Sequence, residues 1–267
     1  MSDDPFGLGA APVDAREFLA ASMEFYASLV SFEAKITVRL TEEPEEIPPQ
    51  VRELYFLRPN RFRVVSSRNR LTMTCVCDGQ TLVETSSGSV DRSTVYDAPI
   101  GIWESRGKDL SHSMFCGSVL YQFFGGSGCL TELANLDKAP IRFEDDEFFA
   151  GEVCKVVQFC GSDRYGNVRV LIGVETGFVH RISYDSAAFL ARMADPKNIE
   201  EARRRIEAKL AGMPPGDDRD RVARRLQESV FLNPPAPAFT HVESYRNIRI
   251  NGELPDELFR IPGPIGL

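Results

Sequence analysis

The side chains that could perform acid, base or nucleophilic chemistry are scattered along this sequence. The three histidines, His112, His180 and His241, fall in three different predicted elements. None has a zinc-ligand spacing such as H-E-x-x-H, and the adjacency in Ser111-His112-Ser113 does not orient a serine toward a base. We therefore expect the histidines to lie at solvent-facing or helix-surface positions. The sequence predicts a protein that is not an enzyme, with no catalytic residues, no metal site and no cofactor.

Three other groups of residues resemble ligand-binding motifs but lack the required spacing. The acidic run at 144–147 has neither the spaced ligands nor the central glycine of an EF-hand, and we interpret it as a charged hairpin tip or edge strand. The glycine-rich run at 125–128 lacks the lysine of a phosphate loop, so we interpret it as a hinge. Disulfides remain open, but we favour buried free thiols for the cysteines, which are Cys75, Cys77, Cys116, Cys129, Cys154 and Cys160.

Charge and hydropathy exclude several classes of protein. The chain has 267 residues, a formal net charge of -8 and a sequence pI near 5.1. Long-range attraction to nucleic acid or anionic lipid requires a positive surface, so we expect no nucleic-acid partner. No run approaches the ~20 apolar residues of a transmembrane helix. The start of the chain lacks the regions of a signal peptide, and residues 1–11 are expected to form a flexible tail.

The periodicity predicts a largely antiparallel β protein. Asp14, with Glu17 three residues later, resembles a capping box and predicts a helix to about Val30. Apolar and polar residues then alternate over 32–40, as in a half-buried strand, and the proline-bearing stretch 41–49 is predicted to be a loop. Evenly spaced turn signals predict two antiparallel meanders, with strands at 51–57, 61–66, 70–77, 80–85 and 89–96, then at 141–149, 152–160, 167–175 and 178–184. A last strand at about 238–250 precedes a short turn or single helical turn at 254–259.

Two segments interrupt this strand pattern. We expect residues 98–136 to form a helical lid, built on an aromatic helix at 109–124. Residues 186–232 are expected to form an inserted, charged helical hairpin with a hinge at 213–216. Its basic clusters are interleaved with acids, as in the i,i+4 pairs Glu200 with Arg204 and Glu201 with Arg205. This favours a salt-bridged exposed helix, while a docking arm for another protein and a nucleic-acid contact remain alternatives.

Three motifs, in their order and separation, resemble the LolA-type outer-membrane lipoprotein carriers and their periplasmic relatives (the LolA, LolB and RseB-like fold). They are the aromatic strand at 54–62 that contains Arg58-Pro59-Asn60, the Asp78-Gly79 hairpin at 77–82, and the closing strand from 239. The resemblance covers about 14–185 and 238–262. It implies a single domain at 12–267, mainly β with α: an open, strongly curved antiparallel half-barrel whose concave face is covered by helices. It also implies a periplasmic location and a cavity that accepts acyl chains.

The resemblance implies roles for particular residues as well. Arg58 matches an arginine that tethers the lid in the carriers, and it is our candidate lid gate. Phe62 matches an aromatic residue near the mouth, although a plain core position fits it equally. The hairpin at 186–232 has no counterpart in the carriers, and the cysteine content is unusual for them. The apolar ligand, an acyl chain or the lipid of a lipoprotein, is expected to contact Phe32, Ile36, Leu54, Phe56, Phe62, Val64, Met114, Phe115, Val119 and Phe123.

A second function fits the same pattern. The aromatic residues at 109–124 also suit a permanently filled core, and the chain would then be a regulatory or structural module, like an envelope sensor. Such a module would bind a lipoprotein or envelope protein through 186–232. The sequence therefore predicts either a carrier of an apolar ligand or a protein-interaction module of the same fold.

Overall fold

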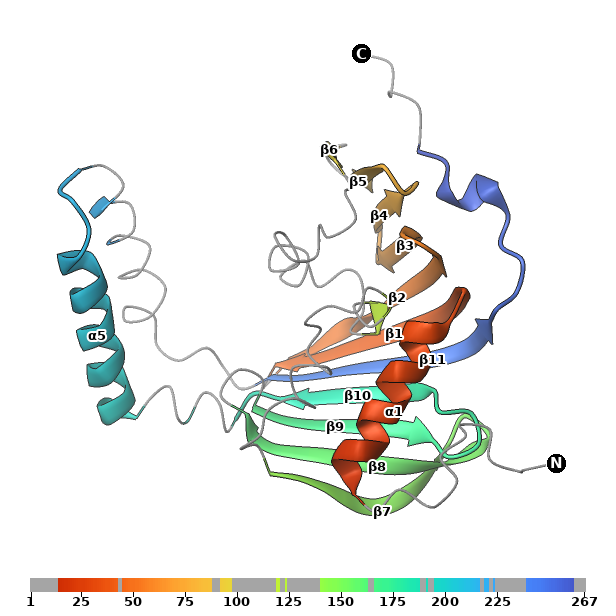
Figure 1. The fold of residues 1–267 in the computed structure, drawn as a ribbon, viewed down its shortest axis with the longest axis horizontal. Coiled ribbons are helices and arrows are strands. Elements are labelled where there is room, and N and C mark those ends of the chain that lie inside the picture. Colours follow the sequence, from red (N-terminus) through yellow and green to blue (C-terminus); the bar gives the residue numbers. More distant parts are fainter. Residues whose placement is uncertain are drawn as a thin grey trace.

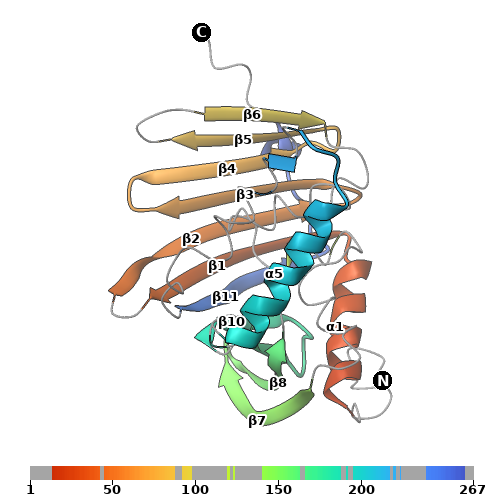
Figure 2. The ribbon, with the colours of Figure 1, turned by 90° about the vertical axis from the view of Figure 1, so that its left-hand side faces the viewer.

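The described chain folds around one antiparallel sheet. A computed structural model describes residues 14–42, 45–87, 92–97, 119–120, 123, 140–162, 166–187, 191, 195–216, 219–220, 223 and 239–261. Within these residues, eleven strands follow the order β6-β5-β4-β3-β2-β1-β11-β10-β9-β8-β7 (Figures 1 and 2). The strands are β1 (Ser31–Glu42), β2 (Glu45–Leu57), β3 (Arg61–Arg68), β4 (Leu71–Cys77), β5 (Thr81–Ser87), β6 (Arg92–Asp97), β7 (Ile141–Phe149), β8 (Glu152–Ser162), β9 (Gly166–Gly173), β10 (Val179–Asp185) and β11 (Phe239–Ile250). The sheet is open because β6 and β7 form its two edges.

The order of the strands confirms the two predicted meanders. Each strand from β1 to β5, and from β7 to β9, pairs with the strand that follows it in the chain. Local turn chemistry sets these hairpins: the Asp78 carboxylate accepts hydrogen bonds from the backbone N–H groups of Gln80 and Thr81, both at 2.8 Å. Gly79, which follows Asp78, has a φ of 102°, which favours glycine. The last strand, β11, joins the two meanders by pairing with β1 and β10.

The predicted loop at 41–49 was wrong. β1 continues to Glu42 and β2 begins at Glu45, so Pro48 and Pro49 lie within a strand. The β1–β2 register shifts between Val38 and Leu40, and β3 pairs with β2 only from Val51 onward. A proline lacks the N–H that donates in a β ladder. At Pro48 and Pro49 no such donor is needed, because the bulge interrupts the ladder with β1 and this part of β2 is not paired with β3.

Helix α1 (Ala15–Ser28) begins at the predicted cap. The Asp14 side chain accepts hydrogen bonds from the backbone N–H groups of Arg16 and Glu17, at 2.5 and 3.3 Å. The helix crosses β7 to β11 and buries one apolar face (Figure 1). The Ser22 hydroxyl donates to the Gly177 carbonyl at 2.9 Å, which attaches α1 to the β9–β10 turn.

One cluster of buried side chains shows how the sheet bends. It contains residues of β1 to β5, β8 to β11 and α1. A flat sheet could not bring the side chains of such distant strands into one cluster with the same helix. The sheet therefore curls around this core as an open half-barrel (Figure 1).

The two inserted segments are described in part. The predicted lid at 98–136 and its helix at 109–124 lie outside the described residues, apart from Val119, Leu120 and Phe123. In the predicted hairpin, α5 (Pro196–Ala211) stands away from the sheet (Figure 1), and Arg203, Arg204 and Arg205 are exposed on it beside acidic partners. Most of the predicted second arm lies outside the described residues. Among the helices that the structure describes, none has both the length and the hydropathy needed to cross a bilayer.

The last described segment lies against β3 of the first meander. The short helix η2 (Asp256–Phe259) forms where a short turn or single helical turn was predicted. Arg61 on β3 pairs with Asp256 at 2.7 Å, and its guanidinium lies 4.9 Å from the centre of the Phe259 ring. These contacts attach the segment after β11 to a strand that is not a sheet neighbour of β11.

Candidate functional site

The concave face of the first meander carries its side chains in rows that run across the strands. In the first row, Phe32, Phe56 and Phe62 are register partners on β1, β2 and β3. In the second row, Ala34, Leu54 and Val64 are aligned in the same way. All six are buried, with at most 2% of each residue exposed. The six sheet residues predicted to contact a ligand comprise five of these and Ile36, and the structure brings them together on one face.

A third row on the same face is polar, and we call it the polar row. It consists of Tyr245 on β11, Arg52 on β2 and Ser66 on β3, aligned through Ile36 on β1. Each is at most 2% exposed. Within the described residues, the Ser66 hydroxyl has no hydrogen-bond partner. Along the strands, the concave face thus changes from aromatic at the first row to polar at the third.

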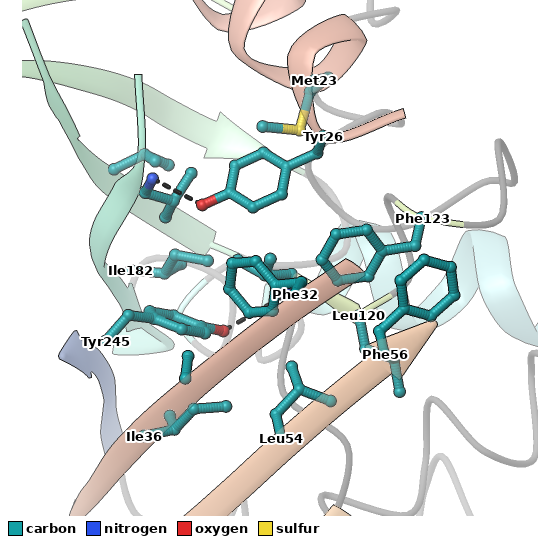
Figure 3. Close-up of a cluster of buried hydrophobic side chains, with 14 of the residues drawn as sticks. Met23, Tyr26, Phe32, Ile36, Leu54, Phe56, Leu120, Phe123, Ile182 and Tyr245 are labelled. Carbon is teal, nitrogen blue, oxygen red and sulfur yellow. Dashed lines mark hydrogen bonds between the residues drawn. The ribbon is translucent and has the colours of Figure 1, made fainter. Parts of the chain in front are cut away.

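Three residues from the predicted lid occupy this face, and we call Val119, Leu120 and Phe123 the plug residues. All three are buried. The Phe123 ring stacks on Phe56, with centroids 4.4 Å apart and planes within 11°, and lies 4.9 Å from Phe32 (Figure 3). Phe123 therefore covers Phe32 and Phe56 of the first row. That residues 98–136 act as a lid stays a prediction. Met114 and Phe115 lie outside the described residues.

Glu243 on β11 organises the polar row. Its carboxylate accepts a 2.5 Å hydrogen bond from the Tyr245 hydroxyl, contacts His241 Nε2 at 3.2 Å, and pairs with Arg52 at 3.8 Å. Burial alone would raise the pKa of Glu243, but the hydrogen bonds and the charges of His241 and Arg52 outweigh burial and lower the pKa to about 2. Glu243 is therefore a buried carboxylate held in its ionised form.

The polar row extends to the plug residues through one hydrogen bond. The backbone N–H of Val119 donates to the Tyr245 hydroxyl oxygen at 3.3 Å. Burial is the main cause that raises the pKa of Tyr245, followed by the charge of Glu243, so this phenol stays neutral. Sequence reasoning missed Arg52, Glu243 and Tyr245 as site residues. The alternation within β2 and β11 did place them on the apolar face, and this signal could have identified them.

Arg58, the candidate lid gate, contacts helix α1. Its guanidinium donates to the carbonyls of Leu29, at 2.6 Å, and Ala27, while its backbone N–H donates to Val30 at 2.9 Å. The guanidinium also lies 5.7 Å from the centre of the Phe56 ring. These carbonyls belong to the unsatisfied end of the helix, which a cation stabilises. Among the described residues, Arg58 therefore fastens the end of α1 beside the first row.

The prediction that the histidines face solvent was wrong for two of them. His180 is 5% exposed, and its Nε2 lies 2.6 Å from the carboxylate of Glu152. Thr176 also donates to Glu152, at 2.7 Å, and together these partners overcome the effect of burial and lower the pKa of Glu152. His241 is partly buried beside Glu243. Glu152 precedes His180 by 28 residues, so sequence spacing gave no signal for that pair, whereas His241 and Glu243 lie two residues apart on β11. His112 lies outside the described residues.

Two other interpretations of the sequence can be compared with the structure. The acidic run at 144–147 lies on β7, the edge strand, as predicted. Cys75, Cys77 and Cys154 are buried, as predicted for thiols that pack as small hydrophobes, and burial raises the pKa of Cys77 and of Cys154 to about 11. Cys116 and Cys129 lie outside the described residues. No group of metal ligands occurs among the described side chains.

Comparisons with known proteins find similarity in structure only. No protein-family model and no curated protein matches the chain. A LolA superfamily protein from Nitrosomonas europaea is 13% identical with a TM-score of 0.35, and the match covers 94% of this chain and 99% of that one. A DUF1329 family protein from Desulfovibrio piger is 12% identical with a TM-score of 0.35, covering 94% and 98%. A domain from Vibrio parahaemolyticus described as outer-membrane lipoprotein-sorting is 11% identical with a TM-score of 0.30, covering 92% and 97%.

One of these solved structures is named as a LolA superfamily protein, and the sequence motifs resemble the same superfamily.

Proposed function

We propose that this protein is a non-enzymatic carrier that holds an apolar ligand, such as an acyl chain or the lipid of a lipoprotein, inside its half-barrel. The ligand lies against the first and second rows and replaces the plug residues. The resemblance of three sequence motifs to LolA-type carriers supports a periplasmic location. No step of this function requires a cofactor.

One observation carries the proposal: the aromatic floor of the half-barrel is covered by a segment that is not part of the sheet. Phe123 stacks on Phe56, yet it reaches that position from the inserted segment between β6 and β7. The sheet strands are joined by backbone ladders, whereas the described plug residues are hydrogen-bonded to the sheet through the Val119 N–H and the Tyr245 hydroxyl. Their contact with the sheet is therefore mainly apolar.

Such a contact suits exchange with a ligand. Burial of apolar surface contributes about 25 cal/mol per Å² regardless of which molecule covers it. When an acyl chain takes the place of Phe123, the floor around Phe32 and Phe56 stays covered and the net free-energy change is small. Plug and ligand thus compete for one surface, and their relative stability sets the affinity.

The proposal is tested by extracting the purified full chain with organic solvent and by native mass spectrometry after incubation with a fatty acid or a fatty amide. The carrier function predicts a bound lipid that is released on denaturation. A chain that stays lipid-free in both experiments, with an unchanged thermal unfolding curve, would contradict it.

One observation favours a second candidate, a protein-interaction module. Helix α5 stands away from the sheet (Figure 1). It exposes Arg203, Arg204 and Arg205 with their acidic partners. Exposed pairs of this kind add little stability. A helix held away from the core presents a surface on which another protein can dock.

Deletion of residues 194–232 separates the two candidates. The carrier function predicts that the shortened chain still binds lipid, because the three rows and the plug residues lie outside the deletion. An interaction module predicts that the deletion abolishes association with a protein partner, and that the intact chain takes up no lipid. A shortened chain that fails to unfold cooperatively would be replaced by the full chain with Arg203, Arg204 and Arg205 changed to Ser.

A further inference from the structure

The plug residues have the same polarity pattern as the surface they cover. At the polar row, Val119 offers a backbone N–H to Tyr245, and at the first row, Phe123 offers an aromatic ring to Phe56. These rows are four residues apart on β1, from Phe32 to Ile36, or about 13 Å along the strand. The plug therefore offers an amide donor to a residue of the polar row and an aromatic ring to the first row.

Glu243 determines which kind of hydrogen bond the site can make. A phenol has a single O–H donor, and the Tyr245 hydroxyl donates its proton to the Glu243 carboxylate at 2.5 Å. The oxygen of Tyr245 is therefore left as an acceptor, and the Val119 N–H occupies it. Because Tyr245 and Glu243 are buried, a ligand that displaces Val119 without supplying a donor leaves this oxygen unsatisfied.

We propose that the ligand of this half-barrel is an amphiphile with an uncharged head that carries an N–H or O–H donor, and that Tyr245 is its specificity-determining residue. This inference rests on the proposed carrier function and adds the class of head group. The head lies at the polar row and the chain follows the first and second rows. The Tyr245 oxygen accepts the hydrogen bond that Val119 makes in the closed protein.

The charges of the polar row favour a neutral head over an anionic one. Arg52 is already paired with Glu243, and Glu243 is held as an anion. A ligand carboxylate placed at the Tyr245 oxygen would face a hydrogen-bond acceptor, with the Glu243 carboxylate directly behind it. Neither the ligand carboxylate nor the Tyr245 oxygen would have a proton to donate to the other. A fatty amide or a monoglyceride avoids this repulsion, whereas an ionised fatty acid does not.

A matched pair of ligands tests the head group in the unmodified protein. N-methylhexadecanamide and methyl hexadecanoate have the same chain and nearly the same shape, but only the amide has an N–H donor. Their affinities are measured by competition with a dansyl-labelled fatty amide. We expect the amide to bind about tenfold more tightly than the ester, which corresponds to about 1.4 kcal/mol. The hexadecanoate anion should also bind more weakly than the amide.

Two tyrosine variants then assign the preference to one hydroxyl. Tyr245→Phe removes the acceptor, and we expect it to bind amide and ester within about twofold of each other. Tyr26→Phe is the matched control: its hydroxyl is equally buried in the same cluster, but it accepts from the backbone N–H of Val179 (Figure 3). It should keep the tenfold preference.

The outcomes separate this inference from the carrier function. Equal affinity of the unmodified protein for amide and ester would overturn the head-group inference and leave the carrier function standing. A preference that survives in Tyr245→Phe would remove the role of Tyr245. Failure of every amphiphile to bind would instead refute the carrier function itself. The ligand pair needs no variant, so poor folding of Tyr245→Phe does not prevent the test.

Discussion

Truncation of Phe123 should strengthen ligand binding while it weakens the fold. The ring lies on Phe56 at 4.4 Å and near Phe32 at 4.9 Å in the closed protein. If a ligand must displace this ring, Phe123→Ala lowers the free energy needed to open the site. If the ring belongs to a permanent core, the same change leaves a cavity and a less stable protein.

The size of the effect follows from burial. A phenylalanine side chain that is fully buried contributes about 1.5–3 kcal/mol from transfer out of water. In a protein that is mostly closed, removal of this contribution raises the apparent affinity for a long-chain probe by about ten- to a hundredfold. The free energy of unfolding of the ligand-free protein should fall by about 3–5 kcal/mol, because the truncation also opens a cavity.

Phe56→Ala is the control, since it removes the other ring of the same stacked pair. Phe56 belongs to the floor, so its loss weakens the plug contact and the ligand contact alike, and we expect the affinity to stay within about threefold of the unmodified protein. Both truncations open a similar cavity. Affinity is measured by fluorescence titration with a dansyl-labelled fatty amide, and folding by circular dichroism. Equal gains in the two variants would mean that the probe merely fills a cavity, and the plug would be refuted.

Three further changes test the elements that support the site. Arg58→Leu removes the donors to the carbonyls of Leu29 and Ala27, so chemical denaturation should show that the free energy of unfolding falls by about 1–3 kcal/mol. The gate role also predicts faster exchange of the probe in stopped-flow measurements, and an unchanged exchange rate would remove that role. The pKa of Glu243 is lowered to about 2, so the contribution of Glu243 to stability is complete above its ordinary pKa of 4.5 and is lost as pH falls toward 2. In Glu243→Gln, the fall in unfolding free energy over this pH range should be smaller by on the order of 2 kcal/mol. An identical pH dependence in both proteins would contradict the assignment. A Cβ at residue 173 would lie 2.4 Å from the Glu152 carboxylate, so Gly173→Ala should disrupt the hydrogen bonds of Glu152 to Thr176 and His180 and lower the melting temperature. The variant should still bind the probe to saturation. An unchanged melting temperature would show that the carboxylate moves freely.

Local patterns in the sequence predicted most of the sheet. The alternation over 32–40, the cap at Asp14 and the Asp78-Gly79 turn each depend on neighbouring residues, and β1, α1 and the β4–β5 hairpin formed where these signals predicted. The prolines at 48 and 49 misled the prediction of a loop, because a bulge opposite them removes the need for their N–H groups.

The same alternation placed the predicted ligand contacts on one face. Phe32, Phe56 and Phe62 are in phase within their strands, so a hairpin ladder brings them into one row. Whether a ligand contacts this row stays a prediction, as does the gate role of Arg58. The carbonyls that Arg58 contacts at the end of α1 lie 29 and 31 positions before it in the sequence, so the local pattern does not predict this contact.

The sequence by itself determined which residues form strands and which side of each strand is apolar, because both follow from a period of two over a few residues. Only the tertiary structure decided which strands become neighbours. β11 lies about two hundred residues after β1, yet it pairs with β1 and places Tyr245 opposite Ile36. That non-local register brings Arg52, Tyr245 and Glu243 together in a buried cluster that bonds the Val119 N–H, and its position depends on how the whole sheet curls around its core.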